Sequence, residues 1–184
     1  MDFKHAAMFP TPVHSGGNPF SADTRPENWP FELLTNKGKY GLKAMIHLAG
    51  LKADEVAQIA GIAEANGIPK KFLDHILSEL RKAGFVHSKK GKAGGYALAK
   101  PAHSISAGQI IRVLDGPLAP IQCSSVTAYR RCEDCADEER CAVRRIMVEA
   151  RNALSAVLDK RSIAEMRLLE EPQERSIVLS HLDK

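Results

Sequence analysis

Residues 69–100 read PKKFLDHILSELRKAGFVHSKKGKAGGYALAK, and this stretch decides the fold. Its first half begins at a proline, which suits the first position of a helix because the missing N–H costs little there. Apolar residues then recur on one helical face, at Leu73, Ile76, Leu77, Leu80 and Ala83. The second half predicts a β-hairpin, with strands at 85–88 and 96–99 joined by a loop whose glycines permit positive φ angles. We therefore predict a helix followed directly by a hairpin.

Two more helices are predicted upstream of this stretch. The first covers residues 35–51, where apolar residues follow a helical spacing behind a Thr or Asn cap. The second covers 55–65, and Gly67 ends it in a left-handed conformation. Three short helices before a glycine-rich hairpin make a winged helix-turn-helix. We therefore expect a mainly α fold with a small β-hairpin wing.

A long helix is predicted at 141–161, after a helix that Ser106 caps and a loop that contains the cysteines. Its apolar residues recur at alternating spacings of four and three, which is a heptad seam: Val143, Met147, Ala150, Leu154 and Val157. So short a seam also suits a helix packed on its own domain. The small core before it leaves little surface to cover so long a helix. This favours a dimerisation helix that pairs two copies of the chain.

Five segments follow from composition and pattern. The N-terminal arm at 1–34 holds five of the ten prolines and shows no helical or strand period, so we expect it to be disordered or loosely packed. The other segments are a winged helix-turn-helix DNA-binding domain at 35–102, a connecting helix and cysteine-rich loop at 103–140, a dimerisation helix and short final helix at 141–170, and a polar tail at 171–184.

Overall composition limits the possible functions. The formal net charge is only +4, so a nucleic-acid partner must be argued from local charge. No apolar run approaches the roughly 18 residues of a membrane span, and the N-terminus lacks a secretory signal. We therefore expect a cytoplasmic protein with no membrane partner. No nucleophile–base pair, phosphate-binding loop or open metal site of His and carboxylate appears, so we do not expect an enzyme.

Local charge favours DNA as the partner. Lys70 and Lys71 begin the third helix, at the positive end of its dipole, where phosphate is attracted and side chains can reach base edges. No acidic residue occurs from 86 to 100, and the hairpin there carries Lys89, Lys90, Lys92 and Lys100. A flexible basic loop fits beside or into a minor groove. The alternative is a solvated lysine-rich loop, and the helix-turn-helix beside it favours DNA.

All four cysteines fall in one window, Cys123-x8-Cys132-x2-Cys135-x5-Cys141. Thiolates held this close suit a soft metal or an iron–sulfur cluster. Three interpretations remain open: a cluster, a structural zinc site, although only one CxxC unit is present, and a thiol–disulfide switch. If the site holds zinc, the metal could stabilise a docking loop, and the chain could be a protein-interaction module rather than a DNA-binding one. Cys141 begins the long helix, where the helix dipole lowers the pKa of a thiol.

Four stretches resemble one bacterial regulator family: KGKYGLKAM at 37–45, IAEANGI at 62–68, LRKAGFV at 80–86 and GKAGGYAL at 91–98. The family is that of the iron–sulfur cluster regulator IscR and the nitric-oxide-sensing repressor NsrR, and the similarity covers about residues 35–165. The resemblance implies a homodimeric transcriptional repressor on a palindromic double-stranded DNA operator. The third helix would read the major groove and the wing the minor groove. A family glutamate that contacts a base is replaced here by Asp74, which is one methylene shorter.

The resemblance also implies a set of metal ligands. Family members with clusters use three cysteines, the last two separated by five residues, and the matching residues are Cys123, Cys135 and Cys141. Two other family ligands are absent, because Arg144 stands where some members have His and 37–39 reads KGK where others have Asp. Cys132 is therefore the expected fourth ligand, which completes an all-cysteine 2Fe–2S or 4Fe–4S site.

Two sets of candidate site residues result. The residues predicted to bind DNA are Lys37, Lys39, Tyr40, Lys70, Lys71, Asp74, His75, Lys90, Lys92, Gly94, Gly95 and Tyr96. The residues predicted to hold the metal are Cys123, Cys132, Cys135 and Cys141. We expect the state of the metal site to control the affinity for the operator.

Overall fold

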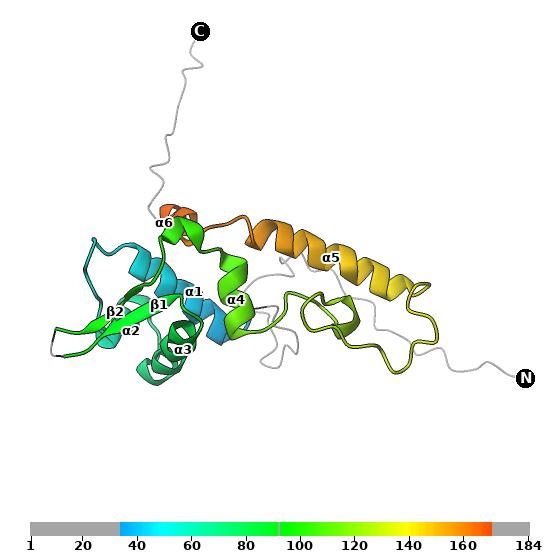
Figure 1. The fold of residues 1–184 in the computed structure, drawn as a ribbon, viewed down its shortest axis with the longest axis horizontal. Helices are drawn as coiled ribbons and strands as arrows, with labels where there is room; N and C mark the ends of the chain where they lie inside the picture. Colours follow the sequence, from blue (N-terminus) through cyan, green and yellow to red (C-terminus); the bar gives the residue numbers. More distant parts are fainter. Residues whose placement is uncertain (1–33, 92, 171–184) are drawn as a thin grey trace, which may run out of the picture. The chain divides into compact units, whose positions relative to one another are not determined.

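The computed structural model describes residues 34–91 and 93–170, which form six α-helices, two short 3-10 turns and one β-hairpin (Figure 1). The predictions for the N-terminal arm, for Lys92 and for the polar tail lie outside the described residues. Within them, the predicted mainly α fold with a two-stranded wing is confirmed. None of the helices in this described part has the length and hydropathy of a membrane span.

The first three helices follow from local signals. The helix α1 (Asn36–Ala49) begins at Thr35, whose side chain accepts hydrogen bonds from two backbone N–H groups of the first turn. The helix α2 (Ile59–Asn66) ends at Gly67, which has a φ of 61°. The helix α3 (Lys70–Lys82) follows Pro69 directly. Its predicted apolar stripe is buried, except for Ala83, which lies just past the helix and is exposed.

The predicted start of the second helix is wrong by four residues. The helix begins at Ile59, not at Glu55. The residues before it are extended, because Ala57 forms an antiparallel bridge with Tyr96 of the wing. The backbone N–H of Ala57 donates to the Tyr96 carbonyl at 2.9 Å, and the reverse bond measures 2.8 Å. These backbone groups are therefore satisfied by a distant strand, which competes with the local helical tendency.

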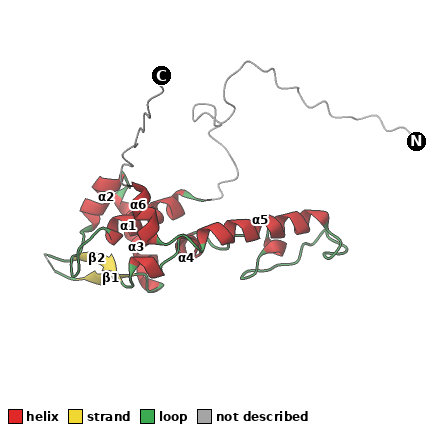
Figure 2. Cartoon of the chain, turned by 90° about the horizontal axis from the view of Figure 1, so that it is seen from above, coloured by secondary structure: helices red, strands yellow, loops and turns green. Residues whose placement is uncertain are grey.

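The wing is an antiparallel pair of short strands, β1 (Val86–Lys89) and β2 (Gly95–Leu98). Val86 pairs with Leu98 and Lys89 with Gly95. The connecting loop at 90–94 is therefore shorter than predicted, since the strands include Lys89 and Gly95. Figure 2 shows both strands at the margin of the helical body.

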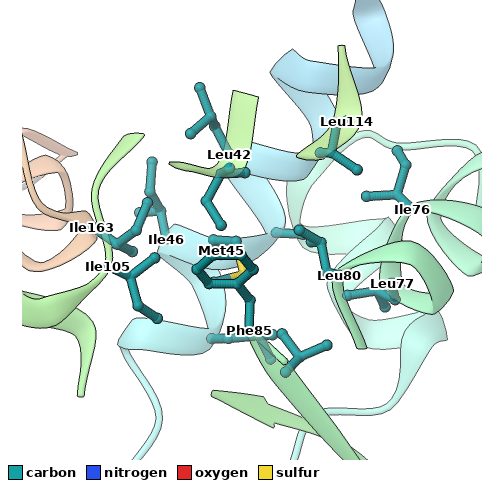
Figure 3. Close-up of a cluster of buried hydrophobic side chains, with 14 of the residues drawn as sticks. Leu42, Met45, Ile46, Ile76, Leu77, Leu80, Phe85, Ile105, Leu114 and Ile163 are labelled. Carbon is teal, nitrogen blue, oxygen red and sulfur yellow. The ribbon is translucent and has the colours of Figure 1, made fainter. Parts of the chain in front are cut away.

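A single hydrophobic core lies around α1 and includes residues beyond the predicted boundary at 102. The helix α1 contacts α2, α3, β2 and two later helices, α4 (Ala107–Leu114) and α6 (Ile163–Glu170). Figure 3 shows Met45 of α1 surrounded by side chains from α3, α4 and α6 and by Phe85 and Ile105. Met45, Leu77, Leu80, Ile105 and Ile163 are fully buried. The later helices thus complete the core of the winged helix.

The longest helix, α5 (Ala142–Leu158), has no buried residue. Asp159 after its last turn accepts two hydrogen bonds from Arg112 of α4, at 2.6 and 2.8 Å. Elsewhere α5 packs against the short turn η3 (Gln122–Ser124). The apolar seam is only partly covered: Val143 and Val157 are 62% and 61% exposed, and Ile146 beside the seam is 56% exposed, whereas Met147, Ala150 and Leu154 are half-buried. The seam therefore leaves both of its ends open, while its middle is partly covered.

Candidate nucleic-acid interface and cysteine site

A basic hollow of about 420 Å³ lies between the start of α2, the start of α3 and the wing. We call it the wing groove. It is lined by Gln58, Ile59, Ala60, Lys70, Arg81, Ser88, Lys89, Lys90, Gly94, Gly95 and Tyr96. Four of these residues are cationic and none is acidic. Such a hollow attracts a phosphate backbone, because no internal carboxylate competes for the cations.

The exposed face of α3 lies beside this groove and carries Lys70, Lys71 and Asp74. Asp74 makes no hydrogen bond or ion pair with any described residue, so its carboxylate is free to accept one. Phe72, on another side of the same helix, is 58% exposed, and sequence reasoning did not include it among the site residues. An exposed phenylalanine on a helix that can enter a major groove suits contact with the methyl group of thymine. The sequence did contain a signal for this exposure, because Phe72 lies outside the apolar stripe of the third helix.

Two predicted DNA contacts are engaged within the protein. Lys37 Nζ lies 2.8 Å from one carboxylate oxygen of Glu79, and His75 Nε2 lies 2.7 Å from the other. Both residues would need to exchange this partner for phosphate. Lys39 is exposed, with its ammonium 5.4 Å from the centre of the Tyr40 ring. This placement leaves Lys39 open to a phosphate.

The predicted glycine and tyrosine contacts of the wing have a structural role of their own. A Cβ on Gly95 would lie 2.4 Å from the carbonyl oxygen of Ala57, so only glycine lets β2 approach the segment before α2. A Cβ on Gly94 would lie 2.2 Å from the Lys89 carbonyl oxygen. Tyr96 is half-buried against the core. All three nevertheless line the wing groove, together with Lys70 and Lys90.

The wing groove adds two cations to the predicted set. Lys89 belongs to β1, and Arg81 reaches the groove from the last turns of α3, where its guanidinium donates to Ser88 Oγ at 3.4 Å. The lysine-rich run had marked Lys89. No local pattern marks Arg81, because only the packing of the wing on α3 places it there.

The four cysteines occupy two kinds of environment. Cys123 lies in η3 and is 5% exposed, whereas the other three are partly exposed on the following loop. Cys141 is the N-cap of α5, and its Sγ accepts a hydrogen bond from the backbone N–H of Arg144 at 3.4 Å. This bond, together with a hydrogen bond from Cys135, lowers the pKa of the Cys141 thiol. The predicted effect of the helix start is confirmed.

The remaining partly exposed thiols are harder to ionise. A hydrogen bond to Asp134 and the charge of that carboxylate raise the pKa of Cys132 to about 12. The pKa of Cys135 is raised mainly by its hydrogen bond to Cys141. The charge of Cys123 adds a smaller contribution to the raised pKa of Cys132. Bound metal would reverse these preferences, since coordination stabilises the thiolate.

The donor set fits a thiolate-ligated centre in its chemistry. No group of three or more His, Cys, Asp or Glu side chains among residues 34–91 and 93–170 is arranged as a finished metal site. The loop between Cys132 and Cys141 would therefore have to rearrange to direct four sulfurs at one point. Tyr129 donates a hydrogen bond to Glu138 across this loop, and that bond raises the pKa of the Tyr129 hydroxyl.

Two arginines of α5 hold the turn that contains Cys123. Arg144 Nε donates to the carbonyl oxygen of Cys123 at 3.0 Å. Arg151 donates through one terminal nitrogen to the carbonyl oxygen of Ser124 at 2.6 Å. Neither contact could be inferred from the sequence, because each joins residues more than twenty positions apart. The cysteine loop is thus attached to α5 at both of its ends.

Comparison with known proteins gives consistent matches. The family model described as Rrf2, iron-dependent transcriptional regulator, matches residues 34–167. An rrf2-like HTH-type transcriptional regulator of Rhodobacter capsulatus is 40% identical over 137 residues, which are 73% of this chain and 91% of that protein.

Solved structures give the same result. CymR, the global cysteine regulator of Bacillus subtilis, superposes with a TM-score of 0.59 at 34% identity, covering 74% of this chain and 96% of CymR. The IscR structure from T. potens has a TM-score of 0.61 at 29% identity, covering 78% of this chain and 92% of that one. These relatives are regulators of transcription and not enzymes.

Proposed function

We propose that this chain, which belongs to the Rrf2 family of transcriptional regulators, binds its operator with an affinity set by an iron–sulfur cluster on Cys123, Cys132, Cys135 and Cys141. That it is a DNA-binding regulator of transcription, and not an enzyme, follows from the family. The cluster, the palindromic operator, the homodimer and the cytoplasmic location are parts of the proposal.

DNA recognition is assigned to α3 and the wing groove. Lys71 and Asp74 are exposed on α3 and have no ion-pair partner in the described part of the chain, so they can reach phosphate and base edges. The cations of the wing groove then hold the adjacent backbone. Phosphate contacts supply affinity for any sequence, whereas Asp74 and Phe72 would supply choice of sequence.

The observation that carries the cluster is the position of all four cysteines in one stretch, 123–141, which ends at the start of α5. Cys141 is stabilised as thiolate by the helix terminus, and Cys123 is buried beneath α5. An all-cysteine cluster would supply one-electron redox chemistry and sensitivity to oxidants. The description of the Rrf2 family as iron-dependent agrees with iron at this position.

Control of DNA binding is assigned to α5, because that helix carries both the cysteine site and the apolar seam. Arg144 and Arg151 face the cysteine turn, while Val143 and Val157 are exposed. A second copy of the chain is the proposed occupant of the seam, in the manner of a coiled coil. Movement of the cysteine loop would then alter how two wings are spaced on DNA.

A thiol switch is the second candidate, because Cys135 and Cys141 lie on one loop and their interaction raises the pKa of Cys135 and lowers that of Cys141. With hydrogen peroxide as oxidant, the two thiols would pass two protons and two electrons to the peroxide. They would form one disulfide, and the peroxide would leave as two waters. This candidate needs no metal.

One experiment separates the candidates. The full-length protein is purified without oxygen, and iron, sulfide and zinc are measured beside the visible spectrum. Operator binding is then measured before and after removal of iron by a chelator. Our proposal expects iron and sulfide in equal amounts and at least a tenfold change in affinity. Stoichiometric zinc without iron would contradict it, and a peroxide-dependent change in metal-free protein would favour the switch.

A further inference from the structure

The attachment of the cysteine turn to α5 depends on two side chains that stand on one face of that helix. Arg144 and Arg151 are seven residues apart, so they lie almost in line along α5. They donate to the consecutive carbonyl oxygens of Cys123 and Ser124, at 3.0 and 2.6 Å. Cys123 and Ser124 are 5% and 1% exposed, so these bonds are made at a buried surface.

Arg144 also touches the other end of the cysteine window. Its backbone N–H donates to Cys141 Sγ at 3.4 Å, while its side chain reaches the Cys123 carbonyl. A single residue therefore joins two cysteines that are separated by eighteen positions in the sequence. Arg151 adds the bond to Ser124, and the loop also has contacts within itself, such as the bond from Tyr129 to Glu138.

We infer that Arg144 and Arg151 are positioning residues that fasten the first cysteine, Cys123, to the helix that begins at the last one, Cys141. The inference extends the proposed function, on which it rests for its biological meaning. The two arginines fix the distance between the ends of the ligand window while the middle of the loop can rearrange. A bound centre would thus be coupled mechanically to α5 through two charge-assisted hydrogen bonds.

The burial of Cys123 gives a test that needs no metal. Metal-free, reduced full-length protein is treated with a maleimide, and the reaction of each cysteine is followed by mass spectrometry. In the wild type, Cys123 should react much more slowly than Cys135, because it is 5% exposed beneath α5. Arg144→Ala should speed the reaction of Cys123 roughly tenfold, since a hydrogen bond from a charged group is lost. Arg144→Lys, which keeps the charge and a donor, should recover part of the protection.

Arg145→Ala is the matched control. It removes the same charge and side chain one position later, and the Arg145 side chain is exposed and makes no hydrogen bond or ion pair with the described residues. Its Cys123 should react at the wild-type rate. An unchanged rate in Arg144→Ala, or an equal rise in Arg145→Ala or at all four cysteines, would overturn the inference.

A second measurement uses protein reconstituted with iron and sulfide. Arg144→Ala should lose iron several-fold faster than wild type and Arg145→Ala, with an altered visible spectrum. If the wild type takes up no iron, the proposed function fails. The alkylation result still decides whether Arg144 fastens the turn, so the two failures are distinguishable.

Discussion

The wing groove allows a quantitative prediction about salt. Lys89 and Lys90 line a hollow that contains four cations and no carboxylate, so each lysine is free to replace a counterion on a phosphate. Each phosphate contact contributes about 0.9 to the slope of log affinity against log salt. The proposed dimer would present two grooves. Lys89→Ala with Lys90→Ala removes four cations per dimer and should reduce the slope by about 3 to 4.

The assay is fluorescence anisotropy with operator DNA and with a scrambled duplex at several salt concentrations. Both duplexes should lose affinity to the same extent, because phosphate contacts carry no sequence information. The matched control is Arg145→Ala with Lys160→Ala, which removes the same charge from exposed positions that do not line the wing groove. If the control lowered the slope as much, overall charge would explain the effect and the groove would have no special role.

Four other changes have expected outcomes. Wild-type protein should bind an operator containing thymine more tightly than one containing deoxyuridine, which lacks the methyl group, and Phe72→Ala should remove this difference. Equal affinity of the wild-type protein for the two operators would refute the contact. Leu154→Glu should separate the dimer in sedimentation experiments, because the seam would have to bury an unpaired carboxylate, and a persistent dimer would show that the seam lies elsewhere. Cys132→Ala should give a cluster that loses iron faster, and unchanged stability would mean that another group is the fourth ligand. The hydrogen bond from Arg112 lowers the pKa of Asp159, so their pairing stabilises the fold above the ordinary pKa of an aspartate, and this stability is lost as the pH falls through the lower pKa of the folded state. Asp159→Asn should therefore make the free energy of unfolding depend less on pH in the acid range. An unchanged pH dependence in this variant would contradict the prediction.

Much of the fold was predictable because its signals are local. The apolar stripe of α3, the cap at Thr35 and the left-handed Gly67 each depend on neighbouring residues, and the structure confirms all three. The cysteine window also needed no fold to be noticed, because its spacing alone indicates a metal or redox site. The lowered pKa of Cys141 followed from its place at a helix start.

Several features of the candidate site could not be read in this way. Arg81 lines the wing groove only because the hairpin packs on α3. Lys37 of α1 reaches Glu79 of α3 only because these two helices pack together. The start of α2 was predicted wrongly because Ala57 pairs with a strand nearly forty residues later. Gly95 looked like a contact for DNA, yet its first constraint is the carbonyl of Ala57.

The sequence by itself determined the order of the helices, the wing, the heptad pattern and the cysteine window, since these depend on residue type and short spacing. The tertiary structure alone decided which surfaces stay open. It leaves the two ends of the α5 seam and the Phe72 side chain exposed, and it brings Arg144 to the carbonyl of Cys123. The physical reason is that burial and long-range hydrogen bonds depend on which elements pack together, and that choice minimises the free energy of the whole chain rather than of any one segment.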